Sequence, residues 1–264
     1  MFQPAIYQQR RDKLAALLPD SLILFLGNVD SPMNYHDNIF PFVQDSSFRY
    51  FFGLNEPGLA GVMDTASGDT TLFGNDPDVA DIVWTGELPT LAERAARAQV
   101  GRSQPYADLA GVLAAARAAG RSVHYLQPYR GETVLALAGL LDCNPQTAQQ
   151  GYSEALTRAV VSLREIKGEE EIAEMEAALA VTRDAHLAAM RAARPGVVEH
   201  AIVGEMEGIV RRHDWQLAYP SIFSRRGEVL HNHHHDQVLQ AGDLVVNDTG
   251  AASSGGYASD ITRT

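Results

Sequence analysis

Two aspartates toward the end of the sequence have the spacing of a paired carboxylate site. In GDLVVNDTGAASSGGYASDITRT, an apolar strand ends in Asp248, and a second strand carries Asp260 after a Gly- and Ser-rich turn. A hairpin of this kind sets Asp248 and Asp260 on neighbouring strands. Carboxylates that converge on one face repel each other unless a proton or a cation lies between them. A divalent metal is the natural partner, since a bridging carboxylate is a standard part of two-metal hydrolases.

Two hydroxyl side chains accompany these aspartates. Tyr257 lies within the turn, and Thr262 lies shortly after Asp260. Groups beside a metal centre commonly hydrogen-bond to its ligands and orient them, so we expect Tyr257 and Thr262 to support the aspartates in this way. The alternative, on spacing alone, is a surface hairpin that carries two solvated aspartates.

The first half of the sequence alternates helix-like and strand-like segments. Helices are predicted at 4–18, 91–100 and 106–120, the last of which stops at a glycine. Short apolar runs predict strands at 21–28, 49–54, 59–64, 70–74 and 123–126. Trp84 lies between strand-like apolar residues, where an aromatic platform is conceivable but a core or subunit-interface position is expected. The pattern predicts a compact α/β unit.

A polar segment at 144–154 separates these elements from a second periodic region and predicts a domain boundary near 155. Beyond it, helices are predicted at 169–193 and about 198–212. The apolar positions near one face of the first helix are Ile172, Met175, Leu179 and Met190. His186 falls on the same face and is expected to be packed and hydrogen-bonded rather than metal-binding. The strand-like segments AYPSIFS, EVLHN, DLVVND and YASDITRT follow.

The composition describes a globular chain and excludes several classes of protein. The chain has 264 residues, of which 45% are hydrophobic, and its net charge of −12 argues against a nucleic-acid partner. No apolar run reaches the roughly 18 residues of a membrane span, so no membrane partner is expected. The N-terminus lacks the pattern of a secretory signal, and the single Cys143 excludes an internal disulfide framework. We therefore expect a cytoplasmic protein.

The segment around the aspartates resembles the first metal-ligand hairpin of the creatinase/prolidase/methionine aminopeptidase family, to which Xaa-Pro aminopeptidase (aminopeptidase P) belongs. The family pattern is Asp-x-Gly, a Gly-Tyr turn and Asp-Ile-Thr-Arg-Thr. This chain reads Asp248-Thr-Gly250, Gly256-Tyr257 and Asp260-Ile-Thr-Arg-Thr264. Upstream, LREIKGEEEIAEMEAALAVTRDAHLAAMRAARPG resembles the family's entry helices, and FPFVQDSSFRYFFGLNEPG resembles a stretch of the aminopeptidase P N-terminal domain. The resemblance covers most of the chain.

The resemblance implies a fold and a chemistry. The expected fold is α/β, with a creatinase-type N-terminal domain at 1–155 and the first half of a pita-bread catalytic domain at 156–264. Two divalent ions, with manganese expected, would serve hydrolysis of the Xaa-Pro bond in a peptide or dipeptide that has proline at its second position. By resemblance, Asp248 would bind one metal and Asp260 would bridge both. His231, at the family's Leu-His position, would stabilise the tetrahedral intermediate.

Some features depart from the family pattern. The turn between the aspartates is one residue longer, Asn232 replaces the family's tyrosine after the histidine, and the stretch from Ser221 to His231 is shorter. A histidine and two glutamates complete the metal site in the family and are not in this sequence. We therefore expect the chain alone to be inactive, with those ligands supplied by a continuation of the chain or by a separate polypeptide. The imidazoles at 233–235 are alternative ligands, but a solvated loop is expected there.

Other functions share this scaffold. A prolidase, which is an Xaa-Pro dipeptidase, uses the same metal chemistry and admits less peptide beyond proline, but the N-terminal stretch favours the aminopeptidase. A non-catalytic binding module would have lost the ligands, whereas Asp248, Asp260 and His231 are present. A creatinase-like hydrolase of a small amidine needs no metal, and the aspartate pair counts against it. A homo-oligomer is compatible with all of these functions.

Overall fold

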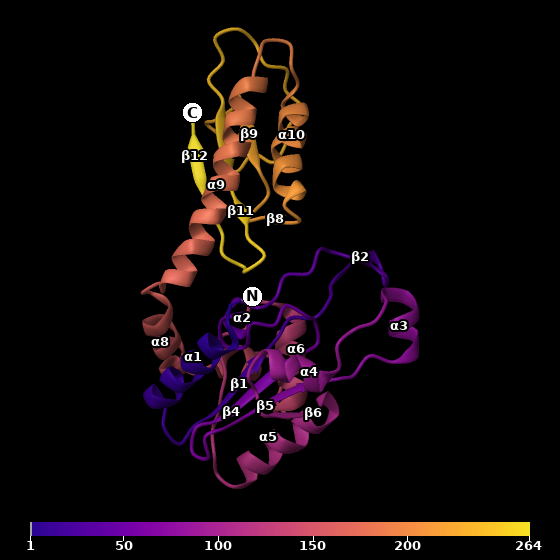
Figure 1. Cartoon of the computed structure of the whole chain (residues 1–264), viewed down its shortest axis with the longest axis vertical. Helices are drawn as coiled ribbons and strands as arrows, with labels where there is room; N and C mark the ends of the chain where they lie inside the picture. The colour runs from indigo at the N-terminus through magenta and orange to yellow at the C-terminus, as the bar shows by residue number, and fades with distance from the viewer. Residues whose placement is uncertain (1) are drawn as a thin grey trace. The chain divides into compact units, whose positions relative to one another are not determined.

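A computed structural model describes residues 2–264 and divides the chain into two compact units (Figure 1). The first unit extends to Ile166, and the second is Lys167–Thr264. The sequence places the boundary near 155, but the division falls after α8 (Glu154–Arg164). The reason is that α8 buries apolar side chains in the core of the first unit, namely Leu156, Ala159 and Val160.

The first unit is built on a five-stranded sheet in the order β6-β5-β4-β1-β7. Its strands are β1 (Leu22–Leu26), β4 (Ala60–Asp64), β5 (Asp69–Gly74), β6 (Arg102–Pro105) and β7 (Val123–His124). Strand β1 pairs antiparallel with the central strand β4 and parallel with β7, and β5 pairs antiparallel with β4 and parallel with β6. The strands expected at 21–28, 59–64, 70–74 and 123–126 are therefore confirmed.

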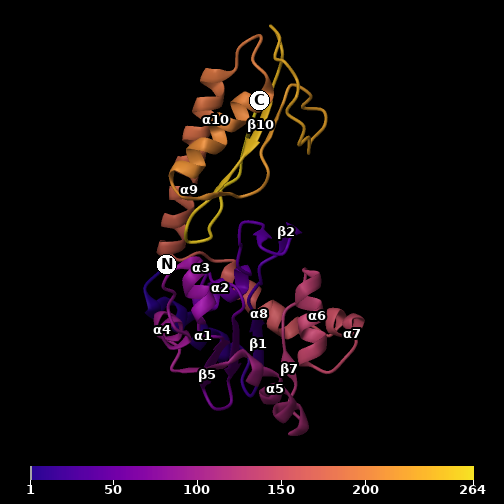
Figure 2. The ribbon, with the colours of Figure 1, turned by 90° about the vertical axis from the view of Figure 1, so that its right-hand side faces the viewer.

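Helices cover both faces of this sheet (Figure 2). One face packs on α1 (Pro4–Leu17), α2 (Ser46–Phe52), α4 (Leu91–Arg97) and α8, and the other on α5 (Leu109–Ala118), α6 (Gly131–Leu140) and α7 (Pro145–Gln150). The remaining elements are the hairpin β2–β3 (Pro32–Tyr35, Asn38–Ile39), α3 (Val79–Thr85) and the 3₁₀ turn η1 (Tyr106–Asp108). Along β1, Ile23 and Phe25 face one core while Leu22 and Leu24 face the other. Burial on both faces explains the continuous apolar run of β1.

One strand prediction in the first unit is wrong, and of the two positions expected for Trp84 only the interface, which stays a prediction, is still possible. Residues 49–54, expected as a strand, lie mostly in α2, which begins where Asp45 accepts hydrogen bonds from the backbone of Ser47 and Phe48. The helix ends at Gly53, whose φ of 70° is the left-handed conformation common after a helix. Trp84 is not in the core, because α3 buries none of its side chains and Trp84 is 85% exposed.

The second unit packs two helices against one side of its strands (Figures 1 and 2). The helices are α9 (Glu169–Ala192) and α10 (Glu199–Arg212). The strands are β9 (Ile222–Ser224), β10 (Val246–Thr249) and β12 (Ile261–Arg263) in the order β12-β10-β9, with a smaller pair made by β8 (Gln216–Leu217) and β11 (Ala251–Ala252). The segment EVLHN is a turn rather than a strand. No helix within residues 2–264 combines the length and apolarity needed to cross a bilayer.

The buried face of α9 differs from the predicted one. Ile172, Leu179 and Met190 are exposed. The buried side chains are mostly small or polar, and they include Ala178, Val181, Thr182, Ala185, His186 and Ala189. Small residues let the helix approach the strands closely, and two polar side chains on this face bond to strand residues. The expectation that His186 is packed and hydrogen-bonded is confirmed.

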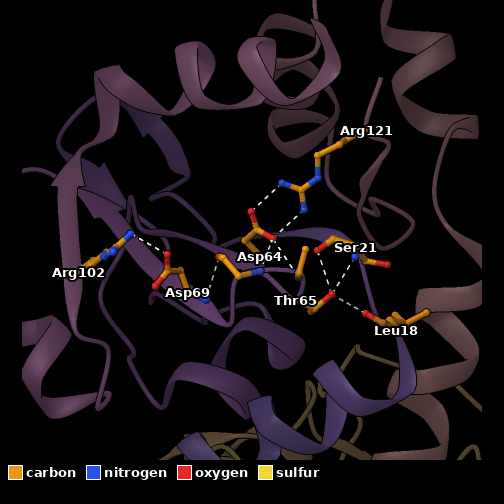
Figure 3. Close-up of polar contacts among 9 residues, drawn as sticks. Leu18, Ser21, Asp64, Thr65, Asp69, Arg102 and Arg121 are labelled. Atoms are coloured by element: carbon orange, nitrogen blue, oxygen red, sulfur yellow. Dashed lines mark hydrogen bonds and ion pairs between the residues drawn. The ribbon is translucent and has the colours of Figure 1, made fainter. Parts of the chain in front are cut away.

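A charged network closes one end of the first sheet (Figure 3). Asp64 on β4 lies directly across from Asp69 on β5, and like charges at such positions are destabilising. Arg121 relieves this by donating two hydrogen bonds of 2.7 Å to Asp64, and Arg102 donates one of 2.8 Å to Asp69. The hydrogen bonds from Arg121 hold the pKa of Asp64 below its usual range.

This pKa shift predicts an acid-sensitive contribution to stability. Arg121→Gln should lower the free energy of unfolding at pH 7 by about 0.5–1 kcal/mol, the usual scale for a partly exposed bidentate pair. A depressed carboxyl pKa stabilises the fold above the unfolded value and is lost as pH falls through the folded value. The difference between the variant and the parent should therefore shrink from pH 7 to pH 3 in urea titrations.

The matched control for this experiment is Arg158→Gln. Arg158 pairs with Glu154 on the exposed surface of α8, where a lone pair contributes little. An Arg121→Gln variant that behaves like Arg158→Gln at neutral pH would contradict the assignment.

Candidate functional site

Strands β10 and β12 place the two predicted aspartates on one face of the second unit. In their antiparallel register, Asp248 lies opposite Thr262. Asp260 directly precedes β12 and is two residues before Thr262, and side chains two apart in extended backbone point to the same face. The carboxylates are therefore diagonal neighbours across the strand pair, as the hairpin prediction requires.

The phenol of Tyr219 joins the two carboxylates. Its hydroxyl oxygen lies 2.5 Å from Oδ1 of Asp248 and 2.9 Å from Oδ1 of Asp260. A phenol carries one hydrogen, so it donates to one carboxylate oxygen at a time. The carboxylate that does not receive this hydrogen bond lies against the same hydroxyl oxygen, and Asp260 is exposed to solvent. The site thus gathers three oxygens around one hydroxyl hydrogen.

The environment keeps Tyr219 protonated. Burial, together with the hydrogen bonds to Asp248 and Asp260, raises the pKa of Tyr219 well above its ordinary value. At neutral pH the hydroxyl therefore remains a hydrogen-bond donor to the pair.

A close backbone contact brings the two strands together beside the aspartates. A Cβ added to Gly250 would lie 1.9 Å from the carbonyl oxygen of Ser259. No side chain fits there, so glycine is required by space. Because Gly250 follows Asp248 by two residues and Ser259 precedes Asp260, this contact holds the two aspartate-bearing segments close to each other.

The donor set fits part of a divalent metal site. Carboxylate oxygens are the ligands that hard cations such as Mn²⁺ and Mg²⁺ take in proteins. Among the residues the structure describes, no group of three or more histidine, cysteine, aspartate or glutamate side chains is arranged to hold a metal ion. Asp248 and Asp260 alone could therefore offer an ion two carboxylates, which is fewer ligands than a hard cation takes.

The two predicted supporting hydroxyls lie in different places. Thr262 is exposed and is the cross-strand partner of Asp248, so its side chain shares the face of the aspartates. Tyr257 donates a hydrogen bond of 2.7 Å to Glu171 at the start of α9. The geometry favours Thr262 more directly than Tyr257, and the supporting role of each stays a prediction.

The histidine-rich segment forms an exposed loop. His231 lies in a turn, and within residues 2–264 its ring makes no hydrogen bond or ion pair with either aspartate. His233 and His234 are also exposed. His235 is half-buried, with Nδ1 3.2 Å from the carbonyl oxygen of Phe223. The expectation of a polar loop at 233–235 is confirmed, and the catalytic role of His231 stays a prediction.

Sequence reasoning missed Tyr219. It occurs in AYPSIFS, which was expected only as a strand. The backbone N–H of Ala218 donates to the carbonyl oxygen of Gly250 at 2.8 Å, and this long-range bond sets Tyr219 beside the aspartates. A tyrosine that precedes a proline has no sequence periodicity or motif spacing that predicts such a long-range contact.

The first unit contains a separate cavity of about 490 Å³ at the charged end of its sheet. Its lining includes the apolar Leu22, Val62 and Phe73 and the charged Asp64, Asp69 and Arg102. These charges are already paired, since Asp64 binds Arg121 and Asp69 binds Arg102. This cavity offers no unpaired carboxylate or cation, and the aspartate pair is the better candidate for chemistry.

Two family models match the chain. Residues 7–124 match the aminopeptidase P N-terminal domain, and residues 173–264 match metallopeptidase family M24. The second match contains both aspartates, and the two matches fall in the two structural units.

Curated proteins and solved structures agree with these matches. The Xaa-Pro aminopeptidase of Escherichia coli (strain K12) is 28% identical over 98% of this chain and 61% of its own length. The Xaa-Pro dipeptidase of Homo sapiens is 22% identical over 96% of this chain and 52% of its own length. Zinc-substituted Escherichia coli aminopeptidase P in complex with product superposes with a TM-score of 0.84 at 27% identity, covering 99% of this chain and 62% of that one. The chain thus spans about three-fifths of the Escherichia coli protein.

The raised pKa of Tyr219 predicts an alkaline effect on stability. A group whose pKa is raised on folding stabilises the fold below its unfolded pKa, about 10 for tyrosine, and loses this contribution as pH rises. Tyr219→Phe should therefore lose less stability than the parent chain between pH 8 and pH 11 in chemical unfolding. Tyr35→Phe, at an exposed tyrosine, is the control and should follow the parent. Parallel profiles for all three proteins would refute the contact.

Proposed function

We propose, on the premise that this chain belongs to metallopeptidase family M24 and carries an aminopeptidase P N-terminal domain, that the intact protein is a metal-dependent Xaa-Pro aminopeptidase. It would release the first residue of a peptide whose second residue is proline. Two proteins similar to this chain are named Xaa-Pro aminopeptidase and Xaa-Pro dipeptidase. The expected cytoplasmic location rests on the sequence alone.

The convergence of Asp248 and Asp260 supports this proposal most directly. Both lie in the segment that matches family M24, on one face of β10 and β12, with one phenol between them. In a surface hairpin with two solvated carboxylates, nothing would offset the repulsion between like charges that lie close together. In a site that binds cations, the cations offset that repulsion.

We propose that Asp248 binds one ion and Asp260 bridges two, with manganese as the expected metal by family resemblance. A histidine and two glutamates, again by resemblance, would complete the site in the intact protein. When bound, such ions supply a water of lowered pKa and polarise the scissile carbonyl. The zinc-substituted relative leaves the identity of the metal in this protein to experiment.

Within this chain, His231 is proposed to donate a hydrogen bond to the oxygen that becomes negatively charged in the transition state. Its exposed turn leaves the ring accessible to a substrate. Tyr219 would keep both carboxylates aimed at the same point. The bond before proline has no N–H, so recognition of proline must come from the shape of a pocket rather than from a donor–acceptor pair.

Two alternatives remain distinguishable by experiment. The chain is also similar to an Xaa-Pro dipeptidase, for which activity would be confined to dipeptides. Longer peptides with proline at the second position separate this function from that of an aminopeptidase. A non-catalytic binding module would hold no metal, and the intact aspartate pair speaks against it.

The open coordination sphere predicts weak metal binding by this 264-residue chain. Calorimetric titration with Mn²⁺ should find at most one ion, with a dissociation constant on the order of 10⁻⁴ M or weaker, because two carboxylates satisfy few of the six positions of a hard cation. Asp248→Asn should abolish the signal. Two tight sites in this chain would overturn the proposed ligand set and would redirect attention to the histidines at 233–235.

The assigned roles predict different effects of two substitutions in the intact enzyme. His231→Ala should leave the metal content unchanged and lower kcat for an Xaa-Pro peptide by about 10²–10³-fold, with a smaller change in KM, since an oxyanion donor acts in the transition state. Asp260→Asn should disturb metal content and turnover together. Elemental analysis and steady-state kinetics provide both readouts. The assignment is wrong if His231→Ala retains full turnover or sheds metal as Asp260→Asn does.

A further inference from the structure

We propose that Thr182 and His186 on α9 are positioning residues that hold Asp248 and Asp260 at their mutual spacing. This inference rests on the proposed function for its consequence and on buried contacts for its geometry. The two side chains are four residues apart, so they lie on one face of α9. They are 0% and 4% exposed, and each contacts the residue immediately before one of the aspartates.

The first contact fixes the segment that carries Asp260. The hydroxyls of Thr182 and Ser259 lie 2.6 Å apart, and the backbone N–H of Ala251 donates to both, at 2.9 and 3.1 Å. Ser259 also reaches the carbonyl oxygen of Ala178 at 3.2 Å, again on α9. Because Ser259 directly precedes Asp260, these bonds also fix the backbone position from which the Asp260 side chain extends.

The second contact fixes the strand that carries Asp248. Nδ2 of Asn247 donates to Nδ1 of His186 at 3.2 Å, and Thr249 donates to Oδ1 of Asn247 at 3.0 Å. Asn247 and Thr249 flank the aspartate and are buried. Burial lowers the pKa of His186 and so favours the neutral ring, whose Nδ1 accepts the hydrogen bond.

The alternation of a strand explains how these contacts act on the aspartate face. Asn247 and Thr249 point toward α9, so Asp248 between them points away from the helix. A slip of one residue would reverse every side chain of the strand, and the buried amide–imidazole bond opposes such a slip. Helix α9 thus holds both aspartate-bearing segments from the face of the strands opposite the carboxylates. A single rigid element then sets the distance between two carboxylates that repel each other.

The rival explanation is that these bonds merely satisfy buried polar groups and stabilise the fold. Three variants of this chain separate the two explanations. Thr182→Val and His186→Leu each remove one anchor, and Thr182→Ser keeps the hydroxyl. Val181→Ala is the matched control, because Val181 is buried on the same helix in an apolar cluster and makes no polar anchor.

The readouts are the dissociation constant for Mn²⁺ alone, the melting temperature and a metal-free crystal structure of each variant. Thr182→Val and His186→Leu should weaken Mn²⁺ binding about tenfold or more, the usual effect of losing a group that orients a ligand. Thr182→Ser should bind nearly as the parent does. Val181→Ala should lose melting temperature yet keep its Mn²⁺ affinity. In the crystal structures of the two anchor variants, one carboxylate should leave the hydroxyl of Tyr219.

The outcomes distinguish this inference from the proposed function. If the parent chain shows no measurable Mn²⁺ binding, which the weak binding expected of two carboxylates allows, the crystal structures alone decide whether the anchors set the spacing. If both carboxylates stay on Tyr219 in Thr182→Val and His186→Leu, the anchors are structural only. The anchors are also structural only if Val181→Ala and the anchor variants lose equal amounts of Mn²⁺ affinity at equal losses of melting temperature.

Discussion

The repulsion between two neighbouring carboxylates is the constraint on which the second unit depends. Asp248 and Asp260 share a face and a phenol, and the phenol has one proton for two acceptors. Such an arrangement persists only if the surrounding fold holds it, since like charges at this separation oppose it. The glycine contact between the strands and the buried bonds to α9 provide that support. The need to hold two like charges together thus explains why polar side chains lie between α9 and the strands, where apolar side chains would otherwise be expected.

Much of this could be predicted from the sequence, because the relevant signals are local. The apolar run of β1 and the short strands at 60–64 and 69–74 follow from period and turn residues. The hairpin that carries the aspartates follows from an apolar strand, a Gly- and Ser-rich turn and a second strand. His186 is packed as expected, although the apolar pattern that suggested it placed the buried face of α9 elsewhere. The family matches in the two halves of the chain agree with the resemblance of the same segments.

The rest depends on contacts that no local pattern encodes. The aromatic run at 49–54 has high strand propensity, yet the cap at Asp45 and the left-handed Gly53 make it part of a helix. The inner face of α9 carries alanines, a threonine and a histidine because the strands approach closely, so the more hydrophobic Ile172 and Leu179 stay outside. Tyr219 is placed in the site by the backbone hydrogen bond that its neighbour Ala218 donates to Gly250, a residue far along the chain.

The phenol of Tyr219 has a consequence for how an ion would enter the proposed site. Because both carboxylates already lie against one hydroxyl, their approach to each other is a property of the folded chain and does not wait for a cation. Under the proposed function, an ion would then meet a carboxylate pair that the fold has already gathered, in contrast to small domains that stay unfolded without metal. Ions could therefore exchange while the fold stays intact, and the occupant would reflect which divalent cation is abundant nearby as well as which one binds best.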